Sequence, residues 1–264
     1  MRLTLPKIIA HRGDRAFAPE NTLVAIRQAA AKGARWVEFD ATLCADTSAP
    51  VVIFHDDRIG RTTNGGDRAL TEVGFAELRA LDAGGWFAPQ FAGEQVPTLA
   101  EVVALCRQLG LGMNIEIKVS ETGAANTPEP FDVALAQLTA RRVVEDLGEE
   151  RADILLSSFS TEALLVAKAL LPEVPRGYLL HSLWPEDAAD PNWPEFRRRL
   201  GLVSPATVNL NEVLITGVGV VAKAEGRPVL AYTVNDVARA QALLALGVAS
   251  IFTDDPGVML AAFG

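Results

Sequence analysis

Residues Thr22–Leu43, with the sequence TLVAIRQAAAKGARWVEFDATL, contain the helix-to-strand unit that predicts the fold. Apolar residues recur at helical spacing over Thr22–Lys32, where Asn21 can cap the start of the helix and Gly33 can end it. The apolar run Trp36–Leu43 that follows has the length of a strand. A helix that leads within a few residues into a strand is the repeating unit of parallel α/β proteins.

The same unit recurs from one end of the chain to the other. The predicted strands are Ile8–Ala10, Trp36–Leu43, Met113–Ile117, Ile154–Leu156, Gly177–Leu180, Thr207–Leu210, Val229–Thr233 and Ala249–Thr253. The predicted helices are Thr22–Lys32, Leu99–Leu109, Phe131–Leu147, Thr161–Leu170, Glu195–Leu200, Val213–Ala224, Val237–Leu246 and Gly257–Phe263, of which Glu195–Leu200 has the weakest pattern. Eight such units predict a closed (β/α)8 barrel, the TIM barrel, as a single domain over residues 1–264. An open, doubly wound sheet is the alternative.

Composition excludes several classes of partner. The chain has 264 residues and a formal charge of −9, which argues against nucleic acid or an anionic membrane as the main partner. It contains no run of the roughly 18 apolar residues that a membrane span needs. Its first residues lack the apolar segment of a signal peptide, so we expect a cytoplasmic protein. Cys44 and Cys106 lie far apart in sequence and are expected to be free thiols.

One apolar run, Val51–Phe54, does not fit the repeat. It follows Trp36–Leu43 after a connection shorter than the dozen or so residues that a parallel crossover needs, so it is expected to return antiparallel. A turn centred near Thr47-Ser48 would pair residue 40 with residue 55. This hairpin would therefore bring His55 beside Asp40.

Residues 57–98 are expected to form an insertion that leaves the barrel after this hairpin. The stretch is rich in Gly and Thr, with a predicted helix at Glu72–Leu81 and the aromatic residues Trp86, Phe87 and Phe91. A rim or lid over the site is one interpretation, and a surface excursion that packs its own aromatic side chains is the other.

Polar side chains stand at the ends of most predicted strands, where barrel enzymes carry out their chemistry. They are His11, Arg12, Glu38, Asp40, Glu116, Lys118, Ser157, Ser158, Asn209, Asn211, Thr233, Asn235, Asp254 and Asp255.

Strand alternation groups four of these side chains. Glu38 and Asp40 share one face of their strand, and Glu116 and Lys118 share one face of theirs. We therefore expect three carboxylates and one ammonium to converge inside the mouth of the barrel. Lys118 can neutralise one carboxylate and a divalent cation the others, and oxygen ligands favour Mg²⁺ or Ca²⁺. A carboxylate–lysine network without metal is the alternative.

Two of the three histidines lie in polar clusters at strand ends. His11 precedes Arg12, and His55 follows the predicted return strand, whereas His181 is expected to be an ordinary packed or surface residue. Two imidazoles at one metal site can serve as general base and general acid, while Arg12 and the metal hold phosphoryl oxygens. The chain has no P-loop, so a phosphodiester fits better than a nucleoside triphosphate.

These motifs together resemble the glycerophosphodiester phosphodiesterase family over nearly the whole chain. The matching stretches are AHRG (10–13), PENT (19–22), VEFD (37–40), VVIFHD (51–56), RTTNG (61–65), ELR (77–79), PTL (97–99), NIEIK (114–118), SSF (157–159), TVN (233–235) and TD (253–254). Two departures bear on substrate preference: Tyr232 stands where the family commonly has Trp, and Ser160 stands where an acidic or amide residue is common.

The resemblance implies an enzyme that hydrolyses glycerophosphodiesters, such as deacylated phospholipid headgroups, to glycerol 3-phosphate and an alcohol. A cyclic phosphate intermediate, formed by attack of the glycerol hydroxyl, is compatible with it. The implied roles are metal binding by Glu38, Asp40 and Glu116, acid–base catalysis by His11 and His55, phosphate contact by Arg12 and Lys118, support of the site by Glu20, and substrate contact by Tyr232.

Two other functions stay open from the sequence. One is a phospholipase-like lyase that acts on intact lipid and stops at a cyclic phosphate, and the other is a barrel that binds a phosphodiester without turnover. The charge of −9 and the lack of a membrane-docking segment disfavour the lyase. A homodimer is among the oligomeric states that the sequence allows.

Overall fold

The computed structural model describes residues 3–119, 130–148, 151, 153–180, 193–222 and 224–263. Its parallel strands form a closed barrel, because β1 pairs with β2 on one side and with β9 on the other. The barrel strands are β1 (Ile8–His11), β2 (Trp36–Thr42), β4 (Gly112–Ile117), β5 (Ile154–Ser158), β6 (Arg176–Leu180), β7 (Thr207–Asn211), β8 (Val229–Tyr232) and β9 (Ser250–Thr253). The predicted (β/α)8 barrel is confirmed, and the open sheet is excluded.

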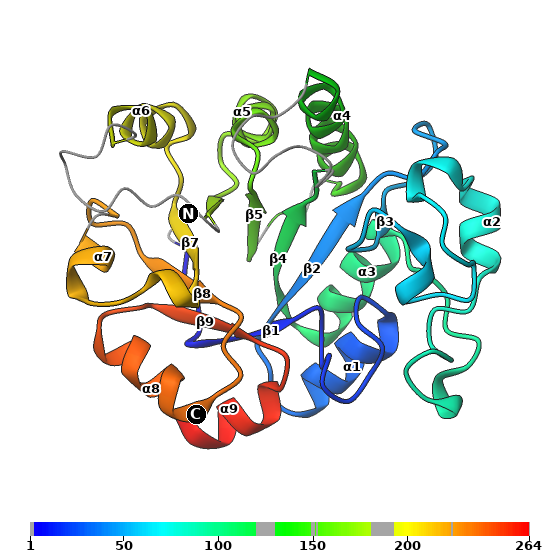
Figure 1. Cartoon of the computed structure of the whole chain (residues 1–264), viewed down its shortest axis with the longest axis horizontal. Coiled ribbons are helices and arrows are strands. Elements are labelled where there is room, and N and C mark those ends of the chain that lie inside the picture. The colour runs from blue at the N-terminus through cyan, green and yellow to red at the C-terminus, as the bar shows by residue number, and fades with distance from the viewer. Residues whose placement is uncertain are drawn as a thin grey trace.

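Helices surround the barrel, and the insertion lies to one side of it beyond β3 (Figure 1). The helices are α1 (Leu23–Ala31), α2 (Phe75–Ala80), α3 (Leu99–Leu109), α4 (Pro130–Asp146), α5 (Thr161–Leu170), α6 (Trp193–Val203), α7 (Val218–Ala222), α8 (Val237–Ala245) and α9 (Pro256–Phe263). Short 3₁₀ turns are η1 (Ile59–Arg61), η2 (Leu70–Glu72), η3 (Pro89–Phe91) and η4 (Glu212–Leu214). Two predicted helices were too long. Within the described residues, the helix predicted from Val213 is replaced by η4 and α7, and the one predicted from Glu72 is replaced by the end of η2 and by α2.

Local sequence explains where α3 begins and ends. The Thr98 hydroxyl accepts a hydrogen bond from the Glu101 N–H, and the Glu101 carboxylate accepts one from the Thr98 N–H. This reciprocal pair satisfies two of the N–H groups that a helix start leaves open. Gly110 follows the helix with φ +66°, which glycine adopts at no steric cost.

The expected cap of α1 is wrong by one residue. Thr22 is the cap, and its hydroxyl accepts a hydrogen bond from the Ala25 N–H. Asn21 lies just outside the helix at φ 60°, and its side-chain amide donates to Asp40 at 2.8 Å. Asn21 therefore uses its side chain to bind Asp40 on β2, and it does not cap α1.

Alternation along the strands divides the interior from the exterior. Val37 and Phe39 face outward into the main helix-covered core, which also contains Ile115 and Ile117. The other parity faces inward, where an apolar cluster fills the barrel below the polar mouth: Ile9, Trp36, Leu155, Leu230 and Phe252. The mouth of the barrel is thus a polar layer on top of a packed apolar floor.

β3 (Val52–Ile53) is the expected antiparallel arm, but its register differs by one residue from the prediction. Ala41 pairs with Ile53, and the Phe54 N–H donates to the Asp40 carbonyl at 2.9 Å. Residue 40 therefore lies opposite residue 54, not 55. The Ile53 N–H also donates to the Pro97 carbonyl, so the end of the insertion holds the arm in place on its other edge.

The insertion packs a small core of its own against β3. Its buried side chains include Ile59, Leu70, Val73 and Leu78, which contact Phe54 and its neighbours. Trp86 makes an edge-on contact with Phe87, and Phe87 makes one with Phe91. Phe87 and Phe91 also pack against Ala18 and Ala25, so these aromatic side chains lie against α1 and not only against one another.

Replacing Gly112 with alanine should destabilise the barrel. A Cβ atom at this position would lie 2.2 Å from the indole ring of Trp36, which fills the floor of the interior. We expect Gly112→Ala to lower the free energy of unfolding by about 1–3 kcal/mol, because the core must shift to admit the methyl group. Urea titration followed by circular dichroism measures this change.

Gly201→Ala is the matched control. Gly201 lies in α6 with no heavy atom within 4 Å of an added Cβ, so the substitution should raise stability by up to about 1 kcal/mol. Equal unfolding midpoints for the two variants would contradict the packing of Trp36 against Gly112.

Candidate active site

Three carboxylates meet at the mouth of the barrel. Glu38 and Asp40 lie on β2 and Glu116 lies on the adjacent β4, where Asp40 and Glu116 are partners in the strand register. Each residue offers one oxygen atom, and the three atoms lie within 4.8 Å of one another. The cluster follows from strand alternation, because all three side chains point inward.

The carboxylates of this cluster are buried and incompletely partnered. Glu38 Oε1 and Asp40 Oδ1 are inaccessible to water and accept no hydrogen bond. Burial, together with the charges of Asp40 and Glu116, raises the pKa of Glu38 well above its usual range. Burial also raises the pKa of Glu116. A set of hard oxygen ligands that disfavour each other's charge fits a divalent cation.

Two cationic side chains flank the carboxylates. Arg12 Nε lies 3.2 Å from Asp40 Oδ2, and Lys118 Nζ lies 3.1 Å from Glu116 Oε1. Burial raises the pKa of Asp40, but the charges of Arg12, His55 and Lys118 outweigh it and lower that pKa to about 2. Asp40 is therefore the member of the cluster whose ionised form its surroundings favour most.

The turn after β1 places Arg12 over the site. Arg12 itself has φ 54°, and its backbone N–H donates to Glu38 Oε2 at 3.0 Å. Gly13 follows with φ +85°, and a Cβ there would lie 2.7 Å from the Ala25 backbone. Only a glycine allows the chain to pass this close to α1.

His11 is oriented by a carboxylate from the other end of the chain. Its Nδ1 lies 2.7 Å from Asp254 Oδ1, and its Nε2 lies 3.9 Å from Glu38 Oε2. Burial lowers the pKa of His11, which favours the neutral ring. With the Nδ1 proton on the side of Asp254, Nε2 can accept a proton beside the acidic cluster.

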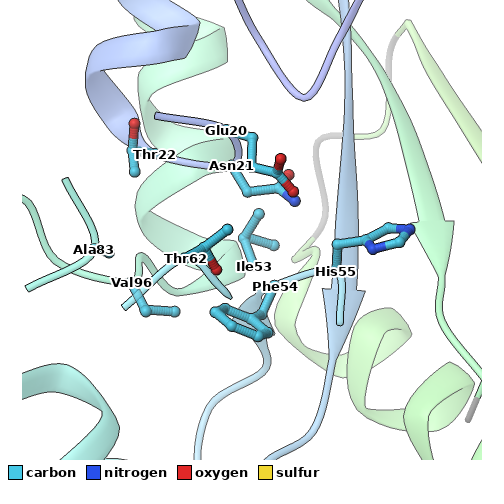
Figure 2. Close-up of a pocket in the computed structure, with 9 residues that line it drawn as sticks. All are labelled: Glu20, Asn21, Thr22, Ile53, Phe54, His55, Thr62, Ala83 and Val96. Carbon is cyan, nitrogen blue, oxygen red and sulfur yellow. The ribbon is translucent and has the colours of Figure 1, made fainter. Parts of the chain in front are cut away.

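His55, which follows β3, is also bound by a carboxylate through Nδ1. Its Nδ1 lies 2.6 Å from Asp56 Oδ1, and its charge influences Asp40 and Glu116. Figure 2 shows the imidazole and the Phe54 ring pointing in opposite directions, so Phe54 packs into the insertion while His55 turns away from it. The cavity lined in part by Phe54 and Thr62 has a volume of about 10 Å³, enough for one water molecule, and does not include the acidic cluster.

Glu20 and Tyr232 complete the set of predicted residues. Glu20 is buried and accepts a hydrogen bond of 2.8 Å from Arg12. The Tyr232 hydroxyl donates to the Leu180 carbonyl at 2.8 Å, and its ring stacks edge-on with Phe159. Burial and the charge of Glu116 raise the pKa of Tyr232, which places its ring near the cluster.

The structure thus brings the predicted site residues together at one mouth, while His181 lies outside the described residues. Asp56 and Asp254 stand in the motifs quoted from the sequence, but the role of orienting the imidazoles was not predicted for them. A signal existed for both, since Asp56 directly follows His55 and Asp254 ends the last strand. Asn235 was likewise missed as a partner: its amide donates to Asp254 Oδ2 at 2.8 Å.

The closed parallel barrel, with acids and two histidines at its mouth, places this protein in the class of barrel enzymes, whose chemistry lies where the strands end. Comparison with known proteins identifies the family. The Glycerophosphoryl diester phosphodiesterase family matches residues 11–258. A glycerophosphodiester phosphodiesterase of Caldanaerobacter subterraneus is 31% identical over 253 residues, which cover 96% of each chain.

Solved structures agree with this comparison. A phosphodiesterase of Oleispira antarctica, determined in complex with the product sn-glycerol-3-phosphate, has a TM-score of 0.83 and 37% identity, covering 98% of this chain and 96% of that one. A glycerophosphodiester phosphodiesterase of Agrobacterium tumefaciens has a TM-score of 0.72 and 25% identity, covering 97% and 100%.

The chain therefore belongs to the glycerophosphoryl diester phosphodiesterase family, and it is a phosphoric diester hydrolase. Within the described residues, no helix has the length and apolar character that crossing a bilayer requires.

Replacing Glu38 with glutamine should stabilise the metal-free protein at alkaline pH. Because the pKa of Glu38 is raised in the folded state, its neutral form supports folding below the unfolded pKa of about 4.3. That support is lost as pH rises through the folded pKa. At about pH 8 we therefore expect Glu38→Gln in EDTA to exceed the wild type in free energy of unfolding by at least about 1 kcal/mol.

Glu77→Gln serves as the control, because Glu77 is an exposed carboxylate that pairs with Arg68 on the insertion. Adding Mg²⁺ or Ca²⁺ should then stabilise the wild type more than Glu38→Gln, since a ligand stabilises the state that binds it. A metal-free Glu38→Gln variant less stable than the wild type at this pH would contradict the electrostatic account.

Proposed function

We propose that the protein hydrolyses glycerophosphodiesters to glycerol 3-phosphate and an alcohol, using a divalent cation and the histidine pair His11 and His55. The observation that carries this proposal is the placement of two carboxylate-oriented imidazoles around the same buried acidic cluster. The product sn-glycerol-3-phosphate bound to the Oleispira antarctica relative supports the substrate class.

The cation would be held by Glu38, Asp40 and Glu116, whose oxygen atoms suit Mg²⁺ or Ca²⁺. When bound, such an ion supplies positive charge that stabilises the phosphoryl oxygens as negative charge develops on them. Arg12 and Lys118 would add to this charge. Burial lowers the pKa of Lys118, but Glu116 and Asp40 outweigh it and raise that pKa, so the ammonium persists at neutral pH.

His11 is the proposed general base. Its neutral ring, held through Nδ1 by Asp254, presents Nε2 to the hydroxyl that attacks phosphorus. That hydroxyl belongs to the glycerol of the substrate, which gives a cyclic phosphate that water then opens, or to water directly. In either case a P–O bond forms as the proton passes to His11.

His55 is the proposed general acid. With Nδ1 bound to Asp56, its Nε2 carries the proton that the oxygen of the departing alcohol receives as its bond to phosphorus breaks. Glu20 would keep the Arg12 guanidinium aimed at the phosphate, and Tyr232 would contact the substrate. The cytoplasmic location, the homodimer and the absence of a nucleic-acid partner stay predictions from the sequence.

The activity assay follows directly from this site. Incubation with glycerophosphocholine or glycerophosphoethanolamine and Mg²⁺ or Ca²⁺ should release glycerol 3-phosphate, and EDTA should abolish the release because the acidic cluster loses its cation. Phosphorus NMR identifies the product. A persistent cyclic phosphate would favour the lyase, and tight binding without turnover would favour a binding protein.

His11→Ala and His55→Ala test the assignment of the acid and the base. Each should lower kcat by about 10²–10⁴-fold, because a positioned proton-transfer group contributes this much. Each should retain the circular dichroism spectrum of the wild type. Near-normal turnover of both variants would show that other groups move the protons.

A further inference from the structure

A continuous chain of ionic contacts joins the two histidines across the mouth of the barrel. We name it the ionic belt, and its seven residues are, in order of contact, His55, Asp56, Arg61, Glu20, Arg15, Asp254 and His11. Negative and positive side chains alternate between the two imidazoles. At each end of the belt, a carboxylate binds the Nδ1 atom of the terminal histidine.

Arg61 joins the insertion to the residues at the mouth of the barrel. Its Nη2 lies 2.9 Å from Asp56 Oδ1 and 2.7 Å from Glu20 Oε1. Its Nη1 adds a second contact to Glu20, at 2.9 Å from Oε2, and its Nε adds a second contact to Asp56. The guanidinium therefore forms two hydrogen bonds to each of two carboxylates, and this bidentate pairing requires the planar donor set of arginine.

The two carboxylates depend on Arg61 to different degrees. Glu20 is buried, and it also binds Arg12 at 2.8 Å and Arg15 at 2.9 Å. Without Arg61, two guanidinium groups would still balance its charge. Among the described contacts, the Asp56 carboxylate binds Arg61 and His55. Loss of Arg61 would therefore release Asp56 more than it would disturb Glu20.

We propose that Arg61 is a positioning residue, which acts through Asp56 to set the direction of the His55 imidazole. A carboxylate held at two points cannot turn, so the ring bound to it keeps Nε2 aimed at the reacting phosphate. The insertion thereby contributes to turnover through the orientation of His55. This inference rests on the proposed function, because it takes His55 as the general acid.

Arg61→Met is the first test, with glycerophosphocholine and Mg²⁺ as substrate and cation. We expect kcat to fall about tenfold to a hundredfold, as for loss of other groups that orient a reacting side chain. KM should stay within about twofold of the wild type, because the lost contact matters in the transition state and not in ground-state binding. The urea midpoint should stay close to that of the control.

Arg58→Met is the matched control. Arg58 is an exposed arginine of the same insertion, and it pairs with Asp67 away from the belt. It should keep the kcat of the wild type. Equal kcat values for Arg61→Met and Arg58→Met would overturn the proposal.

A double-mutant cycle separates positioning from a general structural effect. If Arg61 acts through Asp56, the pair Arg61→Met with Asp56→Asn should lose no more kcat than Asp56→Asn alone. Losses that multiply would show that Arg61 acts by another route, which would also overturn the proposal.

Arg61→Lys keeps a positive charge beside Glu20, so we expect the variant to fold. One ammonium group cannot form two hydrogen bonds to each of the two carboxylates, as the guanidinium does. Its kcat should stay well below that of the wild type, and full activity would overturn the proposal, because it would show that charge and not orientation is what matters.

Failure of the proposed function would look different from failure of this inference. The wild type and Arg58→Met would both release no glycerol 3-phosphate, and the role of Arg61 would be rejected with the function.

Discussion

The burial of three carboxylates at one end of an apolar barrel is the constraint around which this molecule is built. Isolated, ionised carboxylates in such a place would cost several kcal/mol each. Arg12 and Lys118 reduce that cost, and they leave one oxygen atom each of Glu38 and Asp40 without a hydrogen bond. This incomplete balance distinguishes the cluster from an ordinary buried ion pair, and it leaves oxygen atoms that could hold a cation.

The side chains that balance the buried carboxylates are themselves paired with groups of opposite charge farther from the cluster. Arg12, which balances Asp40, is itself held by Glu20, and Glu20 is shared with Arg15 and with Arg61. The residues of the ionic belt that balance the buried charge therefore also bind the two imidazoles, and the proposed function gives this second contact its role. The apolar floor beneath keeps this network in place, because a packed interior resists small shifts.

Much of this arrangement could be predicted from the sequence because it follows from local periodicity. The strands of the barrel and most helices were predicted within a few residues, and alternation placed Glu38, Asp40 and Glu116 on inward faces. The hairpin was predicted with a one-residue error in register, because its turn carries none of the dipeptides that specify one. His55 nonetheless lies close enough to lower the pKa of Asp40.

The sequence by itself determined the barrel, its polar mouth and the identity of the acids and histidines, since each depends on residue spacing along one strand or helix. Only the tertiary structure decided which carboxylate orients which imidazole. The contact between His11 and Asp254 joins residues 243 positions apart, and the contact between Arg61 and Glu20 joins residues 41 apart. Such contacts depend on how loops from separate units converge and on the directions their side chains take, and no periodic pattern encodes either.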